Sequence, residues 1–154
     1  MRDILFKAKH KDSERWIEGF YCAMQETTYC FAEDYDKIPV PVHHLIARDE
    51  MTDWGLPNKL RLYEVDPGTL CQYTGKTDAN GVKIWENDIV VFSDTYSTES
   101  GYAEGSCEGK VVWDEETMAF QVTNRLSAES YEALNECAVI GNVFDKREVT
   151  EETS

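Results

Sequence analysis

Basic residues are scarce in this sequence: 15 Lys and Arg stand against 30 Asp and Glu, and the formal net charge is −15. So few cations argue against direct binding to the phosphates of nucleic acids or to an anionic membrane. Three interpretations of the negative charge stay open. It keeps the protein soluble, it recognises a basic surface on a partner protein, or its carboxylates form an array that mimics DNA.

Long apolar runs are also absent. No stretch approaches the ~18 apolar residues of a membrane-spanning helix, and the N-terminus has no apolar segment of signal-peptide length. We therefore expect a cytoplasmic protein. The five cysteines are odd in number and scattered, and they form no C-x-x-C pair, so we expect reduced structural thiols. They are Cys22, Cys30, Cys71, Cys107 and Cys137.

Motifs that carry chemistry are missing as well: the sequence has no P-loop, no G-x-G-x-x-G and no G-x-S-x-G. His43 and His44 are the best metal candidates, but neighbours in a strand point to opposite faces. A calcium loop aligned on Gly81 would need carboxylates where Lys76 and Asn87 stand. We therefore assign no catalytic, cofactor-binding or metal-binding residue, and we expect no cofactor. A site assembled from dispersed Cys, His and carboxylate residues stays open as an alternative.

Aromatic residues, by contrast, are plentiful: eight Tyr, six Phe and four Trp favour strands over helices. Alternation and turn signals, of which Asn80-Gly81 is the strongest, place the strands. We predict strands over residues 4–9, 15–24, 28–32, 60–64, 69–73, 82–85, 88–92, 110–113, 119–122 and 137–144. Residues 34–41 and 48–58 are predicted to be irregular, and 93–106 a flexible loop or an extended hairpin tip. One helix is predicted over 127–136.

These elements predict a mainly β fold: a small barrel or strongly curved antiparallel sheet with one short helix near the C-terminus, or α+β if helical additions are larger. The length of 154 residues favours a single domain over 1–147, followed by an acidic, frayed tail over 148–154. Four side chains show core alternation, namely Tyr73, Ile84, Ile89 and Val91. Asp88 follows a strand break and could accept backbone N–H bonds or cap a turn.

Three motifs resemble the YopX family of phage and prophage proteins: MRDILFKA at residues 1–8, VDPGTLCQYTGKTDANGVKIWENDIV at 65–90, and VIGNVF at 139–144. The family more often has Tyr where this chain has Trp85, and Gly where it has Asn87. The resemblance implies a β-rich core with helical additions and a bacterial host cell, and it allows self-assembly. It brings no catalytic residue with it.

Charge, missing motifs and resemblance together favour a non-enzymatic phage accessory protein. It would bind a host or phage protein with a basic surface through its own acidic face. One or two exposed tryptophans beside acidic residues would form a binding hot spot, while most of the four should pack inside. The alternatives are a small enzyme with a dispersed site and a structural subunit that closes into a ring through its strand edges.

Overall fold

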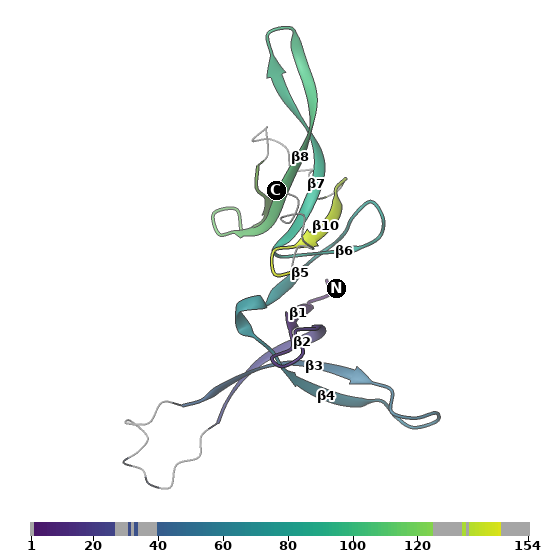
Figure 1. The fold of residues 1–154 in the computed structure, drawn as a ribbon, viewed down its shortest axis with the longest axis vertical. Helices are drawn as coiled ribbons and strands as arrows, with labels where there is room; N and C mark the ends of the chain where they lie inside the picture. Colours follow the sequence, from purple (N-terminus) through teal and green to yellow (C-terminus); the bar gives the residue numbers. More distant parts are fainter. Residues whose placement is uncertain are drawn as a thin grey trace, which may run out of the picture. The chain divides into compact units, whose positions relative to one another are not determined.

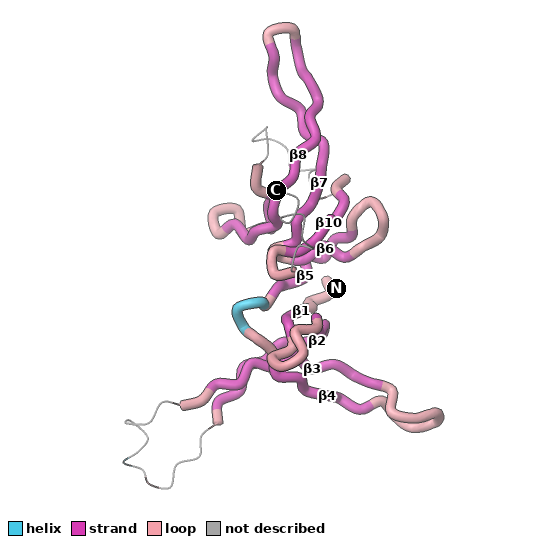
Figure 2. Tube along the Cα trace, in the orientation of Figure 1, coloured by secondary structure: helices cyan, strands magenta, loops and turns pink. Residues whose placement is uncertain are grey.

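The computed structural model describes residues 2–26, 31, 33, 40–124, 134 and 136–145. Its strands form two antiparallel sheets with almost no helix; η2 (Pro67–Thr69) is a single 3₁₀ turn (Figure 2). The chain divides into two compact units. The N-terminal unit is Ile4–Cys71, and the C-terminal unit is Gln72–Ser154 together with Met1–Asp3.

Four strands of the N-terminal unit pair in the order β4-β3-β2-β1 (Figure 1). They are β1 (Phe6–Lys9), β2 (Trp16–Gln25), β3 (Val42–Glu50) and β4 (Lys59–Glu64). The predicted opening hairpin is confirmed, because β1 and β2 pair antiparallel. One face of the sheet carries a buried cluster of Ala8, Ile17, Ile46 and Val65. Gly19 is required where β2 crosses β3, since a Cβ there would lie 2.2 Å from the Ala47 carbonyl oxygen.

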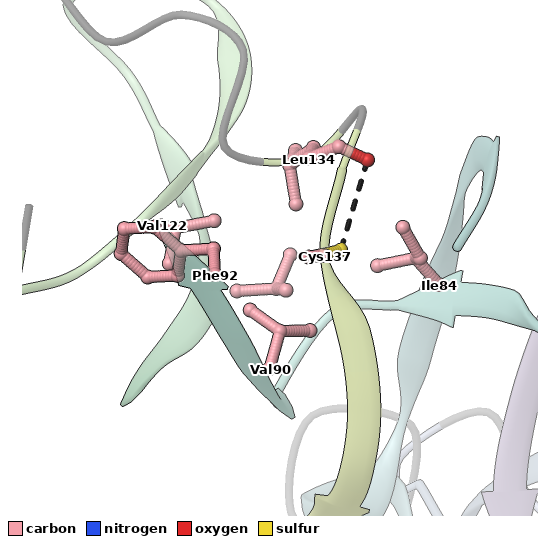
Figure 3. Close-up of a cluster of buried hydrophobic side chains, with 7 residues drawn as sticks. Ile84, Val90, Phe92, Val122, Leu134 and Cys137 are labelled. Atoms are coloured by element: carbon pink, nitrogen blue, oxygen red, sulfur yellow. Dashed lines mark hydrogen bonds between the residues drawn. The ribbon is translucent and has the colours of Figure 1, made fainter. Parts of the chain in front are cut away.

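The C-terminal unit contains β5 (Cys71–Thr77), β6 (Lys83–Trp85), β7 (Asp88–Thr98), β8 (Gly101–Asp114), β9 (Ala119–Val122) and β10 (Ala138–Asn142). β5 pairs with β6, and the other four form a sheet in the order β10-β7-β8-β9. Side chains from several of these strands meet in one buried cluster (Figure 3). The cluster comprises Ile84, Val90, Phe92, Val111, Val122, Leu134 and Cys137.

The long hairpin of β7 and β8 pairs continuously from Ile89↔Lys110 to Thr98↔Gly101. Its distal part extends as a two-stranded ribbon beyond β10 and β9 (Figure 1). Two structures were predicted for residues 93–106, a flexible loop and the end of an extended hairpin. The extended hairpin is confirmed. The second predicted hairpin is also confirmed, because β8 and β9 pair through Trp113↔Phe120 around the turn that follows Asp114.

The predicted barrel is wrong for the described residues. The four-stranded sheet is open, with β10 at one edge and β9 at the other. The other sheet is open as well, because its strand order begins at β4 and ends at β6. The predicted helix over 127–136 is not supported: residues 125–133 and 135 lie outside the described residues, and Leu134 and Glu136 have turn and bend backbone.

Two further expectations need correction. Residues 48–50, predicted to be irregular, belong to β3, a strand that the sequence patterns missed. In β7 the buried residues are Val90 and Phe92, while the predicted core residues Ile89 and Val91 are only half-buried. All four are apolar, so alternation could not fix which face turns inward. Tyr73 and Ile84 are buried as predicted.

Some predictions are untested. The strand over 28–32 falls almost wholly outside the described residues, and so does the tail over 148–154. The single domain over 1–147 stays a prediction. No helix among the described residues is long and apolar enough to cross a membrane; the cytoplasmic location stays a prediction.

Candidate protein-binding surface

Residues of the central and closing sequence motifs form a buried polar network, and its role is structural. The Asp78 carboxylate accepts hydrogen bonds from the backbone N–H groups of Asn80 (2.8 Å), Val82 (2.9 Å) and Val139 (3.0 Å). These bonds, that from Val139 most strongly, lower the pKa of Asp78. The carboxylate thus closes the Asn80-Gly81 turn and holds β10 beside it.

Asp88 performs a second structural task in the same unit. One of its oxygens accepts the Trp85 backbone N–H (2.8 Å), and the other accepts the Asn142 side-chain amide (2.9 Å). This confirms the expected hydrogen bonding of Asp88 to backbone N–H. Asn87, just before it, has φ +69°, a left-handed conformation that asparagine tolerates and glycine adopts most easily.

A surface with the opposite character lies on β2, β3 and β4. Phe20, Ala47 and Leu62 form one cross-strand row, so their side chains share a face of the sheet. By the same register, Met24 and Leu60 lie on this face too. Phe20, Met24, Leu60 and Leu62 are each more than half exposed. We call these four residues the apolar face.

Core packing on the other side of the sheet explains why this face stays open. Ile46, whose side chain points away from the apolar face, is fully buried in the cluster with Ala8 and Ile17. Leu45 and Ala47 point toward the apolar face and are buried, as expected for the middle strand of three. Fully burying one large aliphatic or aromatic side chain is worth about 1.5–3 kcal/mol. The four exposed ones therefore leave much of that stabilisation unused, as binding surfaces do.

The loop between β3 and β4 adds an exposed tryptophan. Its turn is closed by Asp53, whose carboxylate accepts the Trp54 N–H (2.8 Å) and whose carbonyl accepts the Leu56 N–H (3.3 Å). Gly55 supplies the positive φ of +79°. Trp54 is 91% exposed in this turn. We call residues 51–58, which also carry exposed Met51 and Leu56, the hairpin tip.

Carboxylates flank both features. Glu18 and Asp49 are exposed and share the face of Phe20 and Leu60 by strand register. Asp53 is exposed beside Trp54. An apolar centre with a charged edge is the arrangement of a protein-binding hot spot. The predicted exposed tryptophan beside acidic residues is thus found at Trp54.

The other tryptophans divide between core and surface. Trp85 is buried, Trp16 is half-buried under the Lys7 and Lys9 ammonium groups, and Trp113 is 43% exposed. The prediction that most of the four tryptophans pack inside is therefore confirmed only in part.

The two adjacent histidines turn to opposite faces, as the strand pattern predicts. His43 contacts Glu26 (Nε2–Oε2 2.9 Å) and Glu64 (Nδ1–Oε1 3.2 Å), whereas His44 Nδ1 meets the Tyr21 hydroxyl at 2.6 Å. Hydrogen bonding to Glu26, then to Glu64, raises the pKa of His43. Hydrogen bonds from His43 and Lys11 lower the pKa of Glu64.

An open pocket of about 360 Å³ borders this network and is lined by Lys11, His44 and Glu64 among others. The His43 and Glu64 side chains are more than a third exposed, so water reaches the pair. The arrangement is a surface ion-pair network. Among the described residues, no group of three or more His, Cys, Asp and Glu is placed to hold a metal ion.

The four described cysteines are free thiols. Cys71 and Cys137 are buried and Cys107 is half-buried, whereas Cys22 is exposed on β2; Cys30 lies outside the described residues. Burial is the main cause that raises the pKa of the Cys137 thiol, and a raised pKa makes a thiol less reactive.

A family model described as "YopX protein" matches residues 5–151. The chain belongs to the YopX family. A search of curated proteins found no match. Among solved structures, the chain is similar to the crystal structure of protein EF1440 from Enterococcus faecalis, with 16% sequence identity and a TM-score of 0.48. That match covers 93% of this chain and 94% of that chain.

Sequence reasoning found the YopX-family scaffold but missed the apolar face. The available signal was that β2 has apolar residues on both faces, with Ile17 on one and Phe20 on the other. Such a strand is usually taken to be buried on both sides. Only the structure separates a second buried face from an exposed one.

Proposed function

We propose that this YopX-family chain is a non-enzymatic phage or prophage accessory protein that binds another protein through the apolar face and the hairpin tip. The observation that carries the proposal is the gathering of Phe20, Met24, Leu60 and Leu62, all more than half exposed, on one face of a sheet whose other face is packed. Trp54, nearly fully exposed, is the anchor residue, because tryptophans contribute most strongly to binding hot spots.

Charge favours a different partner over a second copy of this chain. Each copy carries a net charge of −15, and a face-to-face pair would bring Glu18, Asp49 and Asp53 against like charges. A partner with an apolar centre and a basic rim complements both the exposed side chains and the carboxylates. We therefore infer a host or phage protein with such a surface.

The exposed ion pair of His43 and Glu64 supports the non-enzymatic part of the proposal. Catalytic acid–base pairs work in clefts that limit water and hold pKa values near the working pH. Here both side chains are more than a third exposed, so water reaches the pair. The absence of recognisable catalytic motifs points the same way.

The test is affinity capture from host cells, infected and uninfected, at low salt, with the unchanged chain and two variants. Trp54→Ala together with Leu60→Ser removes the anchor and part of the apolar face. Tyr102→Ala is the matched control, since Tyr102 is an aromatic residue that is 85% exposed in the C-terminal unit.

The proposal predicts a protein that the unchanged chain and Tyr102→Ala retain, that Trp54→Ala/Leu60→Ser loses, and that raised salt releases. Reconstitution with the purified partner should reproduce the same order. A partner held equally by all three chains would assign binding elsewhere. Failure to retain any protein specifically would reject the binding function itself.

A further inference from the structure

A second pocket lies wholly within the C-terminal unit, and the proposed partner-binding surface does not use it. Its volume is about 330 Å³, and its walls include Trp113, Met118 and Phe120 with Thr74, Lys76 and Arg2. Small-molecule sites fall in the range of roughly 300–1,000 Å³. The pocket is therefore at the small end of sites that take an organic ligand.

One wall of the pocket is aromatic. Trp113 and Phe120 are directly opposite each other in β8 and β9, and their rings meet edge to face at 5.0 Å between centroids. This contact fixes the indole while leaving it 43% exposed. Met118, in the turn between the strands, is 76% exposed and supplies an adaptable apolar side chain. A flat ring has a fixed surface on which to stack.

Two cationic side chains also line the pocket, which is unusual for this unit. Residues 1–3 and 72–154 contain seven basic and eighteen acidic residues. Four of the basic residues are described, namely Arg2, Lys76, Lys83 and Lys110, and two of these line the pocket. The described lining includes no carboxylate. Two cations thus line one pocket in a unit whose net charge is negative, and their charge favours an anion over a cation.

Both cationic residues are connected to β5, Arg2 by packing against it and Lys76 as part of it. The Arg2 stem packs against β5 at Gly75, which has φ +88°: a Cβ built there would lie 3.6 Å from Arg2 Cγ, an ordinary van der Waals distance. The Thr74 hydroxyl donates to the Ile84 carbonyl (2.8 Å) and accepts the Lys76 N–H (3.3 Å). The Thr-Gly-Lys sequence of the central motif therefore contributes Thr74 and Lys76 to the lining of the pocket.

We propose that this pocket binds a small aromatic anion of the nucleoside monophosphate class. The base stacks on Trp113 beside Met118, and the phosphate contacts Arg2 and Lys76. An arginine fork and a lysine together match a dianionic phosphate better than a single carboxylate. Stacking on an aromatic side chain tolerates every base, so discrimination among bases is expected to be weak.

The test is calorimetric titration of the full chain with AMP at low salt, compared with adenosine and with inorganic phosphate. AMP is expected to bind at least tenfold more tightly than either fragment, and its affinity should fall as salt is raised. Millimolar AMP that fails to bind would overturn the proposal. Adenosine that binds as tightly as AMP would also overturn it, because the cations would then contribute nothing.

Variants locate the site. Arg2→Gln/Lys76→Gln keeps the aromatic wall and should weaken AMP binding roughly tenfold or more, since each charge-assisted hydrogen bond contributes strongly. Trp113→Leu should weaken the binding of AMP and adenosine alike. Lys110→Gln removes a cation of the same unit outside the pocket and should change AMP affinity less than about twofold. Equal losses in Lys110→Gln and Arg2→Gln/Lys76→Gln would show general charge attraction and reject the site.

Discussion

Polar side chains usually lie at the surface and apolar ones inside, and the two units depart from this rule in different ways. In the C-terminal unit, Asp78, Asp88 and Asn142 are buried. In the N-terminal unit, Phe20 and Leu60 are exposed. The buried polar groups are hydrogen-bonded, so their placement stabilises the fold. The exposed apolar groups contribute less to the stability of the fold, because most of their surface stays in water.

The strongest way to test this contrast compares two tryptophans. Trp85→Ala should lower the free energy of unfolding by about 3–5 kcal/mol, because a buried ring that contacts Tyr73 is replaced by a cavity. Trp54→Ala should change it by less than about 0.5 kcal/mol, since Trp54 is almost fully exposed. Urea unfolding followed by circular dichroism measures both values. Similar losses would mean that the hairpin tip is part of the scaffold.

A second comparison uses two aspartates. Asp88→Ala should cost about 2–4 kcal/mol, because the Trp85 N–H and the Asn142 amide lose their acceptor in a buried site. Asp49→Ala, on the exposed face of β3, should cost less than about 0.5 kcal/mol. Thermal unfolding of the two variants in parallel checks the difference. A small loss for Asp88→Ala would remove the scaffold interpretation of the central motif.

A third comparison places a methyl group on glycines in both units. Gly19→Ala and Gly109→Ala should each cost about 1–3 kcal/mol, because the added Cβ would lie 2.2 Å from a backbone carbonyl oxygen, that of Ala47 or Thr123. Gly141→Ala, which meets no atom within 4 Å, should change stability by less than about 1 kcal/mol. Equal stability of all three variants would show that neither glycine, Gly19 beside Ala47 or Gly109 beside Thr123, lies so close to the neighbouring backbone.

The smallest effect concerns pH and sharpens the role of the His43 network. The raised pKa of His43 gives stability that is complete below its ordinary value of 6.5 and is lost as pH rises through the folded-state pKa. The lowered pKa of Glu64 gives stability that is present above its ordinary 4.5 and is lost as pH falls through the folded-state pKa. The difference in Tm between the unchanged chain and His43→Gln should therefore be largest between pH 4.5 and 6.5. A difference that is constant across pH would mean that the ion pair does not form.

Local patterns predicted the parts of the fold that local chemistry controls. The opening hairpin, the β8–β9 hairpin and the turn at Asn80-Gly81 follow from alternation and turn residues within a few positions of each other. The strand β3 was missed because His43 and His44 interrupt its apolar pattern and Arg48, Asp49 and Glu50 end it. Its strand conformation comes from pairing with β2 on one side and β4 on the other.

By itself, the sequence determined the YopX-family membership, the mainly β character and the scaffold role of Asp88, because each depends on residue types at short spacing. Tertiary structure alone decided which apolar side chains stay in water. Whether Phe20 or Ile17 is covered depends on which face of β2 receives Ala8 and Ile46, and those contacts join residues far apart in the chain. The same holds for the pocket of the C-terminal unit, which Arg2 and Trp113 both line although more than a hundred residues separate them.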